Sequence, residues 1–133
     1  MIFARQRVVP EWTDAFYKRF PYLFADVLTG TESGAESVSP LTDWGVECGI
    51  GWYKLVERLC VDLEAMIVAL PKNERVTYRA SQVKQKFGTL RFYMEKETET
   101  MTKRIGAAEN ESMNVCELCG RPDHEDRPCP TKR

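Results

Sequence analysis

Residues 50–71, IGWYKLVERLCVDLEAMIVALP, decide the fold of this chain. Apolar side chains recur in this stretch at spacings of three and four, which is the period of one face of an α-helix. They are Trp52, Leu55, Val56, Leu59, Cys60, Leu63, Met66, Ile67 and Leu70, and Lys54, Glu57, Arg58, Asp62 and Glu64 fill the other side. The pattern predicts an amphipathic helix of about twenty residues that ends at Pro71.

Two cysteines lie in this helix or just before it. Cys60 falls on the apolar stripe, and because cysteine is among the most often buried residues we expect a structural thiol there. Cys48 belongs to the approach segment of residues 47–51, ECGIG. We interpret it as a packed loop residue. The alternative is a reactive thiolate, which would need a base nearby.

Beyond the helix, residues 75–96 change to a period of two. Val76, Tyr78 and Ala80 alternate with polar residues, as do Leu90, Phe92 and Met94, and a turn is predicted at residues 86–89. The pattern predicts a β-hairpin whose apolar face packs on the helix. The other face would carry Arg91, Tyr93 and Glu95 on one strand, with Arg79 and Lys84 or Lys86 on the other. A slip of one residue would exchange the faces, so the register stays open.

The flanking segments predict less regular structure. Residues 10–20 favour a short first helix that is stopped by Pro21. Residues 29–45 are rich in Gly, Ser and Thr, and they predict a long surface loop. Residues 97–114 show a weak helical pattern.

The end of the chain carries metal-ligand residues spaced as C-x2-C-x4-H-x4-C, namely Cys116, Cys119, His124 and Cys129. Zinc favours four tetrahedral nitrogen and sulfur ligands, and the two-residue gap lets one turn offer two thiolates. We therefore predict a structural Zn²⁺ site, and a closed site of this kind does not catalyse. The alternatives are an incidental or redox Cys-x-x-Cys pair, and Asp123 in place of His124 as a ligand.

These elements predict an α+β fold: two or three helices packed on an antiparallel β-hairpin or small sheet, with a C-terminal zinc-knuckle-like tail. We assign residues 1–114 to the α+β domain and residues 115–133 to the tail. Of the 133 residues, 43% are hydrophobic, which is enough for a core and argues against wholesale disorder. There is no run of the length of a membrane helix and no secretory signal pattern, so we expect a cytoplasmic protein with no membrane association.

Charge is unevenly distributed along the chain. Residues 71–96 carry 7 basic and 2 acidic side chains, although the whole chain has a net charge of -1. The basic segment contains the candidate partner- or phosphate-binding residues Arg75, Tyr78, Arg79, Lys84, Lys86, Arg91 and Tyr93. Guanidinium groups bind phosphates and aromatic rings stack on bases, but an acidic protein surface would suit the same residues. A solvated sheet face that binds nothing is the remaining interpretation.

Three motifs carry a resemblance to a known family. They are ECGIGWY at residues 47–53, VKQKFGTLRFY at residues 83–93 and CELCGRP at residues 116–122. In this order they resemble a family of small uncharacterised proteins from tailed-phage and bacterial genomes, over roughly residues 44–122. Members of that family often complete the metal site with a later Cys-x-x-His, whereas this chain would use His124 and Cys129. The resemblance implies a phage or prophage setting, in which small proteins commonly bind host factors.

Motifs typical of enzymes do not appear: the chain has no GxSxG, HExxH, P-loop or paired-carboxylate pattern. We therefore expect a non-enzymatic binding protein that engages a host protein in the bacterial cytoplasm, as an inhibitor or modulator such as a counter-defence factor. The alternative function is nucleic-acid or nucleotide binding through residues 75–96. The aromatic strand also makes a homodimer a plausible assembly.

Overall fold

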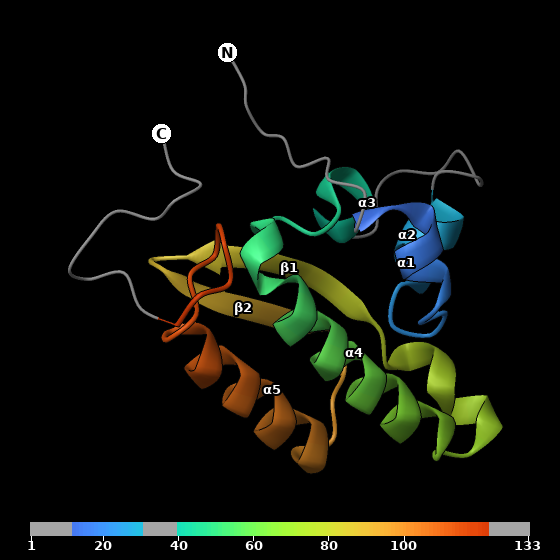
Figure 1. Cartoon of the computed structure of the whole chain (residues 1–133). Coiled ribbons are helices and arrows are strands. Elements are labelled where there is room, and N and C mark those ends of the chain that lie inside the picture. The colour runs from blue at the N-terminus through green and yellow to red at the C-terminus, as the bar shows by residue number, and fades with distance from the viewer. Residues whose placement is uncertain (1–11, 31–39, 123–133) are drawn as a thin grey trace.

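The computed structural model describes residues 12–30 and 40–122, and it combines helices with a small antiparallel sheet (Figure 1). The helices are α1 (Asp14–Lys18), α2 (Ala25–Gly30), α3 (Pro40–Trp44), α4 (Tyr53–Val68) and α5 (Glu99–Ser112), with 3-10 turns at Ile50–Trp52 and Lys72–Thr77. The strands are β1 (Ala80–Lys86) and β2 (Thr89–Met94). Helices α4 and α5 lie side by side against one face of the sheet, and α1 to α3 gather at the end away from the hairpin turn. The α+β class is thus confirmed.

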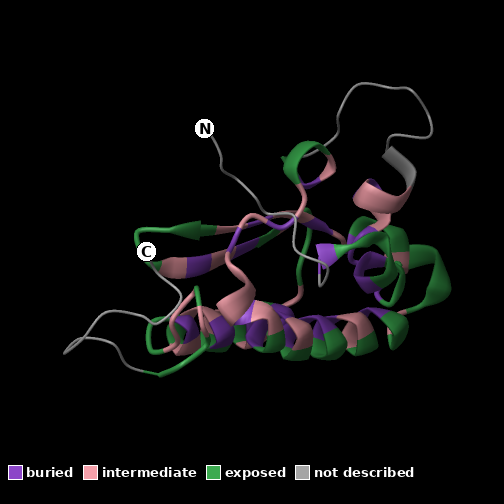
Figure 2. Cartoon of the chain, turned by 45° about the horizontal axis from the view of Figure 1, so that its top comes forward, coloured by how far each residue is buried: buried purple, intermediate pink, exposed green. Residues whose placement is uncertain are grey.

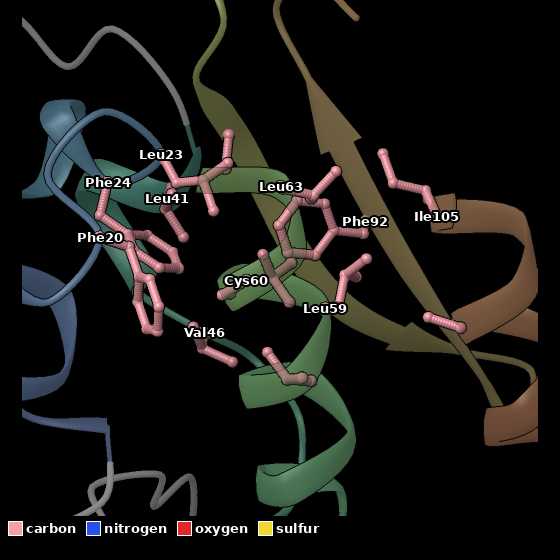
Figure 3. Packing of buried hydrophobic residues seen from close by; sticks show 14 of the residues in the cluster. Phe20, Leu23, Phe24, Leu41, Val46, Leu59, Cys60, Leu63, Phe92 and Ile105 are labelled. Carbon is pink, nitrogen blue, oxygen red and sulfur yellow. The ribbon is translucent and has the colours of Figure 1, made fainter. Parts of the chain in front are cut away.

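Helix α4 is the centre of the core, as its sequence pattern predicts. The side chains of Leu59, Cys60 and Leu63 are fully buried, whereas Lys54, Arg58 and Asp62 on the opposite side of α4 are exposed (Figure 2). Figure 3 shows aromatic and aliphatic side chains reaching α4 from both sides, with Phe24 on the side of the N-terminal helices and Phe92 on the strand side. The helix itself runs from Tyr53 to Val68, shorter by a few residues than the predicted segment, because a 3-10 turn precedes it.

The hairpin forms where the sequence predicts it. Phe87 and Gly88 both have positive φ, at 55° and 81°, which is the backbone of a type I′ two-residue turn. The first strand is nevertheless shorter than predicted, because residues 72–77 form a 3-10 turn instead of extended chain. Arg75 holds this turn by donating from Nε to the carbonyl oxygen of Leu70 at 2.9 Å. The alternation of Val76 and Tyr78 therefore does not reflect a strand.

The first helix and the long loop also differ from prediction. Helix α1 covers only Asp14–Lys18 of the predicted residues 10–20, and residues 10–11 lie outside the described part of the chain. Both ends of the predicted loop 29–45 are helical, in α2 and α3. Pro40 has the fixed φ that suits a first helical turn, and the fully buried Leu41 anchors α3 in the core. The middle of that loop, residues 31–39, lies outside the described residues.

Both edges of the two-stranded sheet are occupied. Glu47 pairs with β1, because its N–H donates to Val83 O and its carbonyl accepts from Gln85 N–H. On the other edge, the outward N–H groups of β2 donate to side chains of α5: Leu90 to Ser112 Oγ at 2.9 Å and Phe92 to Glu109 Oε2 at 3.1 Å. Among the described residues no helix is long and apolar enough to cross a membrane.

Candidate functional site

One face of the hairpin brings together four of the seven predicted binding residues. Lys84 pairs with Arg91, Lys86 with Thr89, and Gln82 with Tyr93, so Lys84, Lys86, Arg91 and Tyr93 share a face. This places two cations directly opposite one another, which destabilises an antiparallel pair. The cations Lys84, Lys86 and Arg91 form no ion pair within residues 12–30 and 40–122.

The other three predicted binding residues serve the fold. Tyr78 is buried, and Lys96 Nζ lies 5.3 Å from its ring centroid. Arg79 Nε lies 3.0 Å from Oδ1 of the buried Asp26, so its charge ties the start of β1 to α2. Arg75 contacts the Leu70 carbonyl and the ring of Tyr22. These residues are therefore not available as a phosphate-binding row.

Phe87 at the hairpin turn is a candidate that the sequence reasoning treated only as part of a turn. Its side chain is 86% exposed, and it adopts a left-handed backbone that bulky residues rarely adopt. Its one ring contact in the described structure is Lys86 Nζ, 5.7 Å from the ring centroid. The sequence signal was an aromatic residue at a turn position where Asn, Asp or Gly is usual.

The thiol loop, residues 115–121, places the first two predicted metal ligands on one tight turn. Gly120 N–H donates to Cys116 O at 2.8 Å, and Cys116 N–H donates to Arg121 O at 2.7 Å. Gly120 has a φ of +83°, which favours glycine at this position. Two cysteines on such a turn suit half of a tetrahedral zinc site.

The other two predicted ligands, His124 and Cys129, lie outside the described residues. Within the described ranges no group of three His, Cys, Asp or Glu side chains is placed to hold a metal ion. The zinc site therefore stays a prediction, with a donor pair whose chemistry and turn geometry suit the metal.

The thiol loop docks on the segment that leads into α4. Gly49 N–H donates to Glu117 Oε2 at 2.8 Å, and Gly51 N–H donates to the Glu117 carbonyl oxygen at 2.6 Å. The indole N–H of Trp52 donates to Val115 O at 2.7 Å. The described part of the predicted tail thus packs directly against the α+β domain.

This docking explains two glycines that the sequence reasoning left without a role. A Cβ added at Gly51 would collide with the carbonyl oxygens of Cys116 and Glu117, and one at Gly49 would lie 2.5 Å from Glu117 O. The colliding atoms belong to the backbone, so they cannot move aside as a flexible side chain would. The motifs around residues 47–53 and 116–122 are therefore two halves of one contact.

The docked loop also reaches the hairpin. Gln85 Nε2 donates to Glu117 Oε1 at 3.3 Å. In both views the hairpin turn, the last turn of α5 and the thiol loop lie at the same end of the molecule (Figures 1 and 2). Exposed apolar side chains in these three segments are Phe87, Met113 and Leu118, and together with the Lys84–Arg91 face we call this region the hairpin end.

Cys48 and Cys60 are buried structural thiols. Burial raises the pKa of the Cys48 thiol far above its usual range, and the nearby carboxylates of Glu117 and Glu47 raise it further. Burial likewise raises the pKa of Cys60, which is fully enclosed. Both groups are therefore protonated at neutral pH, and Cys48 lacks the depressed pKa of a nucleophilic thiol.

No family model, curated protein or solved structure matches this chain. The site is accordingly interpreted from its own chemistry. The hairpin end combines unpaired cations with exposed apolar side chains, and this combination suits binding to an anionic surface that also offers an apolar pocket.

Proposed function

We propose that this chain is a small non-enzymatic binding protein that engages a partner protein through the hairpin end. The observation that carries the proposal is Phe87, which combines a left-handed backbone with an exposed side chain. A residue in this conformation costs stability, and Phe87, whose side chain is 86% exposed, recovers little of that cost by burial. Such a cost is typical of a site that is kept for function.

The chemistry around Phe87 favours an acidic protein surface. Exposed aromatic residues ringed by polar and charged groups resemble the anchors of protein interfaces. Lys84, Lys86 and Arg91 have no acidic partner among the described residues, and the Lys84–Arg91 juxtaposition is relieved when carboxylates approach it.

A second candidate function, binding of nucleic acid, has one observation in its favour: the three cations Lys84, Lys86 and Arg91 share a face with the exposed Tyr93. Three cations would neutralise at most three phosphates, which predicts a salt slope no steeper than about -2.7 on duplex DNA. The chain as a whole has a net charge of -1. This small cationic area fits a protein partner better than a polyanion.

The proposal also includes a structural zinc ion and a host protein as the partner. Zinc held by Cys116 and Cys119, with His124 or Asp123 and Cys129, would fix the thiol loop and supply no catalytic position. The resemblance to the phage and bacterial family suggests that the partner is a host protein in the bacterial cytoplasm, which the chain inhibits or modulates.

The proposal is tested by replacing Phe87 with a photo-crosslinking benzoylphenylalanine in the full chain inside bacterial cells. We expect one discrete heterologous partner, and we expect the purified partner to bind Phe87→Asn at least about tenfold more weakly than the parent chain. The matched control is Val76→Asn, an exposed apolar position outside the hairpin end. Equal affinity of Phe87→Asn and the parent overturns the proposal, and a crosslink to a second copy would instead identify a homodimer.

A further inference from the structure

We propose that the thiol loop and the Gly49–Trp52 segment form a lock that couples metal binding at Cys116 and Cys119 to the geometry of the hairpin end. Docking of the loop and binding of metal by its thiols stabilise each other in this lock. The coupling rests on the metal binding proposed for Cys116 and Cys119, and its consequence for partner binding rests in addition on the proposed function of the hairpin end.

The lock is built from acceptors that lie close together in sequence. Three donors at the start of α4, the amides of Gly49 and Gly51 and the indole of Trp52, are all satisfied by Val115 and Glu117. The amides precede the helix, where no intrahelical carbonyl is available to them. If the loop leaves, all three donors lose their partners at once, so docking is cooperative.

The same loop conformation serves both docking and the thiols. The bonds from Gly120 N–H to Cys116 O and from Cys116 N–H to Arg121 O close the turn that carries both cysteines. A metal held by the two thiolates would fix this turn, so the ordering entropy of the loop is lost once for two events. Binding equilibria are reciprocal. The factor by which metal binding strengthens docking of the loop must therefore equal the factor by which docking raises the affinity for metal.

Glu117 connects the docked loop to the hairpin through its side chain. One of its carboxylate oxygens accepts from Gly49, and the other accepts from Gln85, two residues before Phe87. Leu118, one of the apolar residues of the hairpin end, follows Glu117 directly. Loss of metal would therefore loosen the loop and the recognition surface together.

The decisive experiment perturbs docking without touching a thiol or the hairpin. Gly51→Ala places a Cβ against the Cys116 and Glu117 carbonyl oxygens, whereas Gly106→Ala in α5 meets nothing within 4 Å and serves as the control. Co²⁺ is titrated into the reduced full chain, and the cobalt–thiolate absorption is followed. We expect affinity to fall roughly 5- to 150-fold in Gly51→Ala and to stay at the parent value in Gly106→Ala. Equal affinities in the two variants, or no cobalt–thiolate band in the parent, overturn the coupling.

A second variant covers the case in which Gly51→Ala does not fold by circular dichroism. Glu117→Ala removes the carboxylate bonds to Gly49 and Gln85, and Glu111→Ala on α5 is its control.

In the parent chain, amide exchange at Gly49 and Gly51 is measured by NMR with and without Zn²⁺. We expect about tenfold or more acceleration in the metal-free protein, and unchanged exchange contradicts the lock.

A separate measurement tests whether docking of the thiol loop affects binding of the partner protein. With the crosslinked partner in hand, Gly51→Ala should weaken partner binding, and zinc removal from the parent should do the same. Unchanged partner binding in both cases overturns the link while the Phe87 proposal stands. If Phe87→Asn leaves partner binding intact but Gly51→Ala still lowers cobalt affinity, the proposed function fails and the coupling between docking and metal holds.

Discussion

Lys84 lies directly opposite Arg91 across the hairpin, and neither forms an ion pair among the described residues. Because like charges in this position repel, we predict that Lys84→Glu raises the free energy of unfolding by about 0.2–1 kcal/mol. Urea denaturation of both proteins measures the change. Lys103→Glu, which breaks a favourable pair with Glu99 on α5, should shift stability slightly the other way. A destabilised Lys84→Glu protein would show that repulsion is not the dominant interaction there.

Phe87→Asn should stabilise the isolated protein. Asn adopts the left-handed region more readily than Phe, and the 86% exposed ring gives up almost no burial, so we expect a gain of up to about 1 kcal/mol in unfolding free energy. Thermal unfolding of the two proteins tests this. The same substitution is expected to weaken partner binding, so stability and function would change in opposite directions. A loss of stability would mean that the Phe87 ring supports the fold.

The ion pair between Asp26 and Arg79 should be costly to break from one side. Asp26 is buried, so Arg79→Met would leave a carboxylate without its partner, and we predict a loss of about 3 kcal/mol in unfolding free energy. Denaturant titration gives the value. The double variant Asp26→Leu with Arg79→Met should recover much of the loss, because no buried charge remains. A double variant as unstable as the single one contradicts this account.

Glu64 should contribute a pH dependence to stability. Its carboxylate accepts the N–H groups of Tyr22 and Leu23 at 3.0 and 3.1 Å, but burial dominates and raises its pKa. The native state then holds the proton more tightly than the unfolded chain, whose glutamate pKa is about 4.3. The contribution of Glu64 is therefore fully present below that value and is lost as pH rises through the folded pKa.

The measurement for Glu64 is the difference in unfolding free energy between the parent and Glu64→Gln from pH 4 to pH 7. We expect the parent to lose stability relative to the variant as pH rises. Glu111→Gln should show the opposite slope at the acid end of this range, since the hydrogen bond from Arg58 lowers the pKa of Glu111 and its contribution is lost as pH falls. A difference that does not vary with pH would rule out Glu64 as the titrating group.

The outer edge of β2 should become adhesive when its cover is removed. Glu109 and Ser112 accept the outward N–H groups of Phe92 and Leu90, and an uncovered strand edge pairs readily with another chain. We predict that the double variant Glu109→Ala with Ser112→Ala dimerises or aggregates at concentrations where the parent does not, as measured by light scattering after size exclusion. Glu109→Gln keeps an acceptor oxygen and is the control. A double variant with the mass of the parent would contradict the covering role.

Several elements could be predicted because their signals are local. The apolar stripe of α4 keeps the same helical spacing over all sixteen residues, so its buried face follows from that spacing alone. The turn at Phe87 and Gly88 follows from alternation on both sides of a glycine. The predicted strand from residue 75 was wrong up to Thr77, because residues 72–77 form a 3-10 turn. That turn is stabilised by the hydrogen bond from Arg75 to the Leu70 carbonyl, which alternation does not reveal.

The sequence by itself determined the α+β class, the core helix, the hairpin and the pair of thiols on one turn, because each depends on neighbours within a few residues. The tertiary structure decided which cations of the hairpin lack an ion pair among the described residues and why glycines precede α4. Arg79 became structural because α2 brings Asp26 to it, and Gly51 is a glycine because the Glu117 carbonyl arrives from 66 residues away. Such contacts leave no period in the sequence, since they depend on how separate elements pack.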